Sequence, residues 1–221
     1  MEEKQDIFLK HIKQKIWKDV FVITLLIYIV FCLFVYFIDG AISGTLFSKA
    51  LAGTSAILFA ASFSLSGFCY YWDFLDKKIG YRKYLGLMGF WTALAYSISL
   101  MLVDSQRYFY GFLDNALSAD FILGIISMAI FTFMALISQD SIMKKMGPHN
   151  WRRALRLGYL AWLLLAIRAY VIEKELWAEY INTFDGFPPP RLLLTLLVIA
   201  VIIFRLSIVL AKCKKPWHNK K

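Results

Sequence analysis

Residues 21–38 read FVITLLIYIVFCLFVYFI, a stretch that contains no charged side chain. At a rise of about 1.5 Å per residue, a helix of this length crosses most of a hydrocarbon core about 30 Å thick. In the whole chain 60% of the residues are hydrophobic, whereas soluble domains contain about 45–50%. The sequence therefore predicts an integral membrane protein whose first membrane-spanning helix contains residues 21–38.

Five further apolar stretches of similar length follow the first. They are Leu46–Gly67, Tyr84–Val103, Phe121–Ile137, Leu155–Ile172 and Leu192–Ala211. Little sequence remains between them for a soluble catalytic or nucleotide-binding domain. We therefore expect an all-α, polytopic membrane protein with a six-helix transmembrane bundle over residues 20–212. A cytoplasmic amphipathic helix over residues 1–19 and a basic cytoplasmic tail over residues 213–221 complete the predicted organisation.

The first apolar stretch is longer than the apolar region of a secretory signal peptide. We therefore interpret it as a membrane span. The small residues Ala41 and Ser43 leave cleavage after this stretch as an alternative.

The 25 Lys and Arg residues are concentrated in alternate connecting segments. These segments are the N-terminal region, the link between the second and third stretches, the region of residues 144–156 and the C-terminal tail. The opposite loops carry a net negative charge. By the positive-inside rule, both termini are expected in the cytoplasm. The net charge of +10 thus indicates topology and attraction to anionic lipids, not a nucleic-acid surface.

Three further features each have a structural and a functional interpretation. Phe8, Ile12 and Ile16 recur at four-residue spacing, which favours a helix lying in the lipid headgroups over a helix that docks on a partner. Acidic residues beyond the fifth stretch fall at helical spacing and are interpreted as solvated carboxylates of an extended helix, with a metal site as the alternative. The cysteines form no CxxC motif, so neither a disulfide framework nor a zinc site is predicted. The acidic residues are Glu173, Glu175 and Glu179, and the cysteines are Cys32, Cys69 and Cys213.

The second apolar stretch is rich in small residues, which allow helices in lipid to approach closely. We expect this helix to be central to the packing, with a quinone or substrate pocket as the alternative. Ahead of the fifth stretch, Gly147 and Pro148 should break any helix, and Asn150 is expected as the N-cap of the next one. The small residues are Gly53, Thr54, Ser55, Ala56, Ala60, Ala61, Ser62, Ser64, Ser66 and Gly67.

All three histidines, His11, His149 and His218, lie outside the apolar stretches. A haem inside a bilayer is commonly held by imidazoles on facing helices. No apolar stretch of this chain supplies one.

Two segments nevertheless resemble a haem-binding family. Residues 80–96 read GYRKYLGLMGFWTALAY, and residues 138–168 read SQDSIMKKMGPHNWRRALRLGYLAWLLLAIR. They resemble the third and fifth helices of the ferric-reductase-like transmembrane superfamily, and within it the MsrQ family. The matching residues are Leu85, Gly86, Leu87, Ser138, Asp140, Trp151, Arg156, Leu157, Tyr159 and Leu160. The resemblance implies six helices, a b-type haem and electron transfer to a periplasmic methionine-sulfoxide reductase.

The resemblance also implies which positions of this chain would hold iron. They are Tyr96 and Arg168 near the outer side, and Arg82 and Leu155 near the cytoplasm. None is a histidine. The resemblance further implies that Arg82 faces Leu155 and that Tyr96 faces Arg168.

Two interpretations of the outer position remain open. A tyrosinate can ligate ferric haem, so Tyr96 could hold an atypical haem. Alternatively, Tyr96 and Arg168 hydrogen-bond to each other, Glu173 helps neutralise Arg168, and Arg205 finds a partner or reaches the membrane surface. In this second case the bulky Phe90, Trp91 and Trp162 would fill the volume of the missing porphyrin.

The leading hypothesis is a ferric-reductase-like membrane protein that has lost its haem ligands, is no enzyme, and serves as an accessory or scaffolding subunit of a membrane complex. Its expected partners are the lipid bilayer and another membrane or membrane-associated protein. The alternative is an electron-transfer subunit of a membrane oxidoreductase that uses an atypical haem b or a quinone. A transporter lacks support, because no repeat or pair of broken helices is visible.

Overall fold

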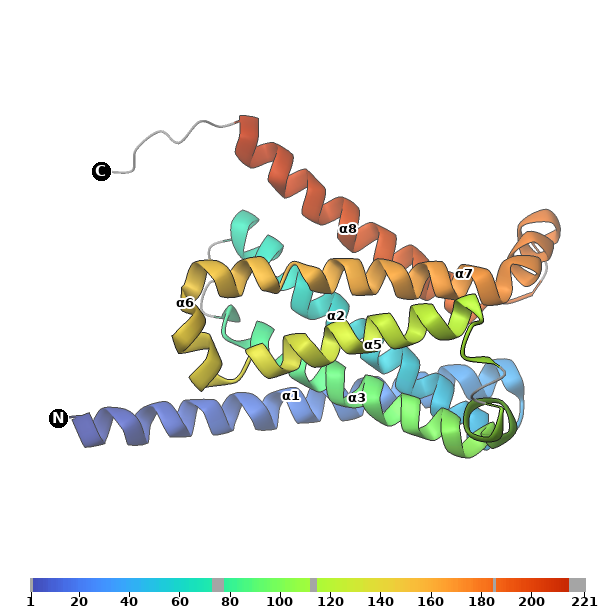
Figure 1. Ribbon diagram of the computed structural model, residues 1–221, viewed down its shortest axis with the longest axis horizontal. Helices are drawn as coiled ribbons and strands as arrows, with labels where there is room; N and C mark the ends of the chain where they lie inside the picture. The colour runs from blue at the N-terminus through green and yellow to red at the C-terminus, as the bar shows by residue number, and fades with distance from the viewer. Residues whose placement is uncertain (1, 73–77, 112–114, 185, 215–221) are drawn as a thin grey trace. The chain divides into compact units, whose positions relative to one another are not determined.

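The computed structural model describes residues 2–72, 78–111, 115–184 and 186–214. These residues form helices and no strand, which confirms the all-α class (Figure 1). The elements are α1 (Glu2–Asp39), α2 (Gly44–Tyr71), α3 (Tyr81–Val103), the π-helical turn η2 (Gln106–Tyr110), α5 (Ala119–Ile137), α6 (Asp140–Ala154), α7 (Leu157–Thr183) and α8 (Pro190–Lys214).

Among the described residues, five helices are long and apolar enough to cross a membrane. They are α1 from Lys10 to Asp39, α2 from Gly44 to Cys69, α3, α5, and α8 from Pro190 to Ala211. Each contains one of the predicted apolar stretches. Helix α7, which contains most of the fifth predicted stretch, is not among them. It carries Arg168, Glu173 and Lys174 within its length, and charged residues are costly in a lipid-exposed helix.

The ends of two predicted segments differ from the helices observed. Helix α1 runs without interruption through residues 19 and 20, so the amphipathic segment continues directly into the first span. Helix α8 likewise continues past residue 212 to Lys214, and the rest of the basic tail lies outside the described residues.

Gly147 interrupts α6, as the sequence predicts, with φ of 74° and ψ of 156°. This left-handed φ is readily available only to glycine. The prediction of Asn150 as an N-cap is wrong, because the helix resumes directly after Gly147. Pro148 accounts for the earlier start, since its fixed φ suits the first helical position and its missing N–H costs no hydrogen bond there.

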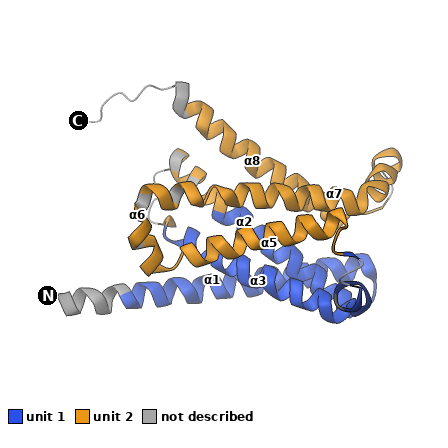
Figure 2. Ribbon diagram, viewed as in Figure 1, with its two compact units in different colours: residues 1–62, 80–115 blue, residues 63–79, 116–221 orange. Residues whose placement is uncertain are grey.

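The chain divides into two compact units, each described here by itself (Figure 2). Unit 1 consists of Met1–Ser62 and Gly80–Asn115, and unit 2 of Phe63–Ile79 and Ala116–Lys221. Helix α2 contributes to both units. It is the most buried of the five candidate spans, which confirms its predicted central role in packing.

In unit 1, α1 packs on the start of α3. The rings of Trp17 and Tyr84 meet edge to face with centroids 5.3 Å apart, and the hydroxyl of Tyr81 donates a hydrogen bond to Asp19 Oδ2 at 2.6 Å. Helix α1 also lies close to α2, because a Cβ atom on Gly53 would come within 2.4 Å of the Phe31 ring. Glycine at position 53 is therefore required for this approach.

In unit 2, α5 and α7 are antiparallel neighbours with a uniform register. Gly158 lies against Met134, and ten residues further along α7 Arg168 lies against Gly124, ten residues earlier on α5. The ring of Phe63, from α2, packs on Tyr159 and on Trp162 with centroid distances of 4.7 and 5.5 Å. Trp162 is 1% exposed, and it forms the centre of the unit 2 core.

Candidate functional site

The candidate site comprises the four positions at which the family resemblance would place haem ligands. Arg82 and Tyr96 lie on α3 in unit 1, whereas Leu155 and Arg168 belong to unit 2. The facing pairs expected from the sequence, Arg82 with Leu155 and Tyr96 with Arg168, therefore each join residues of different units and stay predictions.

On α3, one helical face contains both candidate positions. Arg82 and Tyr96 are separated by fourteen residues, close to four helical turns, or about 21 Å along the axis. Gly86, Gly89 and Ala93 lie between them on the same face, at the three- and four-residue steps that repeat along one side of a helix. The face of α3 between Arg82 and Tyr96 thus carries small residues, as expected for a helix that packs against a flat ligand.

This α3 face is occupied by side chains of α2. A Cβ atom on Gly86 would lie 3.1 Å from Ser62 Oγ, and one on Gly89 would lie 3.2–3.3 Å from the Phe59 ring. Ser62 Oγ also donates a hydrogen bond of 2.8 Å to the carbonyl oxygen of Arg82. The glycines therefore allow α2 and α3 to pack closely. Where Gly86 and Gly89 contact α2, side chains fill the space and leave no room for a porphyrin.

Leu155 lies at the junction of α6 and α7, not within the transmembrane helix expected from the sequence. Its backbone N–H donates to the carbonyl of Trp151 at 3.0 Å, and its own carbonyl accepts from Gly158 at 3.3 Å. The side chain is buried at 9% exposure. Leu155 thus fills apolar space at the turn, and an aliphatic side chain offers no lone pair to a metal.

Arg168 is the charged member of the set on α7. A Cβ atom on Gly124 would lie 3.3 Å from both Cζ and Nε of Arg168, so the missing side chain of Gly124 makes room for the guanidinium against α5. The side chain as a whole is half-buried. Its Nε is buried and has no hydrogen-bond partner, a condition that typically costs about 1–3 kcal/mol for a polar group.

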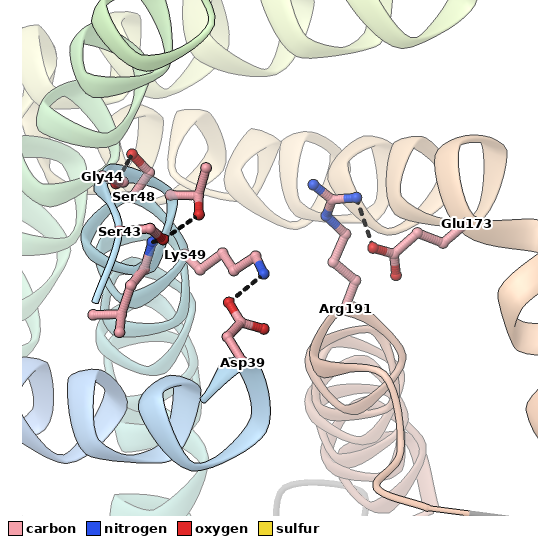
Figure 3. Close-up of polar contacts among 9 residues, drawn as sticks. Asp39, Ser43, Gly44, Ser48, Lys49, Glu173 and Arg191 are labelled. Carbon is pink, nitrogen blue, oxygen red and sulfur yellow. Dashed lines mark hydrogen bonds and ion pairs between the residues drawn. The ribbon is translucent and has the colours of Figure 1, made fainter. Parts of the chain in front are cut away.

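Glu173 does not neutralise Arg168, contrary to the sequence-based expectation. Its Oε1 accepts a 2.7 Å hydrogen bond from Arg191 at the start of α8 (Figure 3). Its Oε2 accepts one of 3.2 Å from Trp177 Nε1. The backbone of α7 is distorted at Glu173, with φ of −120° and ψ of 16°. Glu173 lies more than one turn beyond Arg168, and the nearer opposite charge for it is the arginine of α8.

The aromatic residues expected to fill a porphyrin-sized volume behave differently from one another. Trp162 and Phe90 are buried, at 1% and 8% exposure, but Trp91 is 55% exposed. The expectation for Trp91 is therefore wrong, because its position on α3 points away from the packed face of Gly86 and Gly89. Arg205 is half-buried in α8.

The remaining candidate residues from the sequence are the histidines and the cysteines. His11 and His149 are exposed, and His218 lies outside the described residues. Cys32 and Cys69 form no disulfide with another described residue. In the part of the chain that the structure describes, no group of three His, Cys, Asp or Glu side chains is arranged to hold a metal ion.

Sequence reasoning missed Gly124 and Arg191. Neither stands out in the sequence, because each matters only through a residue of another helix. The antiparallel register of α5 and α7 identifies Gly124 as the neighbour of Arg168. This register could have been proposed from Gly124 and Gly158 only if the pairing of the two helices had been known.

No family model matches the chain. It is similar to the protein-methionine-sulfoxide reductase heme-binding subunits MsrQ of Brucella ovis, Brucella canis and Brucella suis, with 24% identity over 137 residues. The match covers 62% of this chain but only 57% of the length of each relative. The chain is thus a membrane protein with distant, MsrQ-like homology.

Proposed function

We propose that this protein is an MsrQ-like membrane protein without haem that serves as an accessory or scaffolding subunit of a membrane complex. The observation that carries the proposal is the set of residues at the four expected ligand positions. Leu155 is aliphatic, and the guanidinium groups of Arg82 and Arg168 have no lone pair to donate. Only the phenol of Tyr96 could bind iron.

These residues do not fit a low-spin electron-transfer haem, which needs two strong ligands on facing helices. The packing in each unit supports the same conclusion. Ser62 and Phe59 contact the α3 face between Arg82 and Tyr96, and Met134 and Gly124 contact α7 on either side of Trp162. In this proposal the helices act as a structural element of the complex rather than as carriers of a redox group.

The absorption spectrum of the full chain tests the absence of haem. The protein is purified in detergent from cells supplied with a haem precursor, and spectra are recorded before and after dithionite reduction. The Brucella ovis relative, prepared in parallel, controls for haem loading. We expect a Soret band that shifts on reduction in the relative and none in this chain. A shifting band in this chain would contradict the proposal.

The alternative function is electron transfer through an atypical haem or a quinone, and the heme-binding description of the relatives favours it. Tyr96→Phe separates the two possibilities. If the chain shows a Soret band that this substitution abolishes, Tyr96 ligates the iron and the alternative is correct. A colourless wild type that oxidises no added quinol supports the scaffolding role.

We also propose that α7 crosses the bilayer as a sixth span, with both termini in the cytoplasm. The alternation of basic segments along the chain supports this topology. Alkaline phosphatase, which is active only outside the cytoplasm, reports it when fused after chosen residues. Fusions after Gly186 should be active and fusions after Asn150 and Lys214 inactive. Equal activity after Asn150 and Gly186 would show that α7 does not cross.

A further inference from the structure

Helix α7 changes direction at Glu173. The backbone there has φ of −120° and ψ of 16°, outside the helical range, and Figure 1 shows the last turns of α7 leaving the line of the rest of the helix. Two contacts hold Glu173 at this bend. Arg191 Nη1 donates a hydrogen bond to its Oε1 at 2.7 Å, and Trp177 Nε1 donates one to its Oε2 at 3.2 Å. Residues 174–184, which follow the bend, are termed the distal segment.

The bend lies level with the starts of two other helices of unit 2. Helix α5 is antiparallel to α7, and Gly124 of α5 lies against Arg168. Five residues away in each helix, this register brings Ala119, the first residue of α5, level with Glu173. Arg191, the second residue of α8, bonds directly to Glu173. Because α5 and α8 are both candidate membrane spans, the distal segment begins where its neighbouring spans end.

The distal segment has an apolar face and a polar face. With 3.6 residues per turn, apolar side chains spaced by three or four residues lie on one side of a helix. The apolar face comprises Leu176, Trp177, Tyr180, Ile181 and Phe184. The opposite face carries Glu175, Glu179 and Asn182. The sequence after the bend is therefore that of a short amphipathic helix.

Unit 2 leaves most of this apolar face uncovered. Leu176 and Ile181 are each 54% exposed, and Phe184 is 72% exposed. Within the distal segment, which the structure describes throughout, Trp177 alone is buried, at 7% exposure. Its ring lies 5.8 Å from that of Tyr170. A helix this short is marginal in water on its own, so contact of its apolar face with a further surface would stabilise it.

The chemistry of the segment favours the surface of the lipid bilayer as its occupant. Its apolar face carries no charge, and it includes Trp177 and Tyr180, residue types that are enriched at membrane–water interfaces. An amphipathic helix of this kind lies in the plane of the membrane with its apolar face about 5–10 Å into the boundary between headgroups and acyl chains. The polar face is acidic, so the attraction comes from apolar area and not from anionic lipid.

We infer that the distal segment is an interfacial helix whose apolar face binds the surface of the lipid bilayer while its polar face contacts water. That this surface is the outer one rests on the proposed crossing of α7, whereas the scaffolding function is not required. Glu173 is a positioning residue, because its bonds to Arg191 and Trp177 hold the bend from which the segment leaves the bundle.

Spin-label accessibility of the full chain in phosphatidylcholine vesicles tests this placement. The three cysteines of the chain are replaced by serine, and single labels are attached to Leu176→Cys and Ile181→Cys on the apolar face and to Glu175→Cys and Asn182→Cys on the polar face. Oxygen concentrates in the bilayer, whereas a nickel chelate stays in water. We expect the ratio of oxygen to nickel accessibility to be severalfold higher on the apolar face, yet lower than at Ile199→Cys in the middle of α8.

Matched arginine variants test the role of the bend. Arg191→Gln removes the donor to Glu173 Oε1 and should reduce the difference between the two faces. Arg205→Gln, further along α8, should leave the difference unchanged. An unchanged difference in Arg191→Gln would refute Glu173 as a positioning residue.

Three results would overturn the interfacial placement. High nickel accessibility on both faces would place the segment in water. Low accessibility of both reagents at Leu176→Cys and Ile181→Cys would show that protein covers the apolar face. Ratios as high as that of Ile199→Cys on both faces would place the whole segment inside the bilayer. If the faces differ as expected but phosphatase fusions after Asn150 and Gly186 are equally active, the interfacial helix stands and the crossing of α7 fails.

Discussion

Helix α3 in unit 1 and helix α7 in unit 2 contain the segments that resemble the family, and they differ in what surrounds the expected ligand positions. The α3 face is closed by contact, since Gly86 and Gly89 bring it against Ser62 and Phe59 of α2. Helix α7 carries a buried core residue, Trp162, and on another side the charged and incompletely bonded Arg168.

The two helices thus differ in how the residues around the expected ligand positions are stabilised. Packing requires only that volume be filled, and α3 meets this requirement with small residues and one ring. A buried polar group without a hydrogen-bond partner is costly, and α7 carries such a group, Arg168 Nε, against Gly124 of α5. We therefore expect substitutions on the α3 face to act through packing and those at Arg168 to act through its charge.

The largest expected effect sharpens the contrast between two tryptophans. Trp162→Ala removes a side chain that is 1% exposed and should lower the free energy of unfolding by about 3–5 kcal/mol. Trp91→Ala, at a position that is 55% exposed, should change it by less than about 0.5 kcal/mol. Unfolding in detergent, followed by tryptophan fluorescence or circular dichroism, measures both. Similar losses for the two variants would show that the face of α3 bearing Trp91 is packed after all.

The next effect tests whether α3 is closed against α2. Gly89→Leu forces a side chain into the Phe59 ring, 3.2–3.3 Å from the new Cβ, and should destabilise by about 1–3 kcal/mol. In a double-mutant cycle, adding Phe59→Ala should recover part of this loss, because the leucine then fills the space of the ring. A neutral Gly89→Leu would mean that open space, suitable for a cofactor, lies beside α3.

A smaller effect compares the two ion pairs of Figure 3, each within its own unit. Glu173→Gln weakens a pair whose side chains are 15% and 42% exposed and should cost about 1 kcal/mol. Asp39→Asn weakens the pair with Lys49, whose side chains are 25% and 48% exposed, and should cost only a few tenths of a kcal/mol. Stability of both variants is measured at low and high salt. A larger loss for Asp39→Asn would contradict the ranking.

The smallest effect concerns one hydrogen bond between α2 and α3. Ser62→Ala removes the donor to the Arg82 carbonyl, which the structure places at 2.8 Å, and should cost about 0.6 kcal/mol, the average for such bonds between membrane helices. Thr132→Ala, whose hydroxyl bonds within its own exposed turn, is the control. If Ser62→Ala loses no more stability than the control, the hydrogen bond makes no measurable contribution and packing alone holds α2 against α3.

Hydropathy predicted the helices well, because length and composition decide whether a segment can cross a bilayer. The break at Gly147 and the central place of α2 were likewise readable from residue type. The sixth span was different: the apolar run from Leu155 to Ile172 includes Arg168, and its first residue lies outside α7 altogether.

The candidate site was predictable only as a set of positions. The resemblance identified Arg82, Tyr96, Leu155 and Arg168, and their residue types already argued against iron. Their neighbours could not be read from the sequence, because those depend on which helices pair and in what register. Glu173 appeared to be the partner of Arg168 by spacing along one helix, yet Arg191 of α8 binds it instead.

The haem content of the purified chain shows directly whether the protein binds haem. Protein from haem-sufficient cells is extracted with alkaline pyridine, and the reduced haemochrome is compared with the amount of chain. We expect no haem above the level of a mock purification, and we expect the Brucella ovis relative prepared in the same way to contain haem in a fixed ratio to protein. A constant haem-to-chain ratio in this protein, maintained through purification, would contradict it.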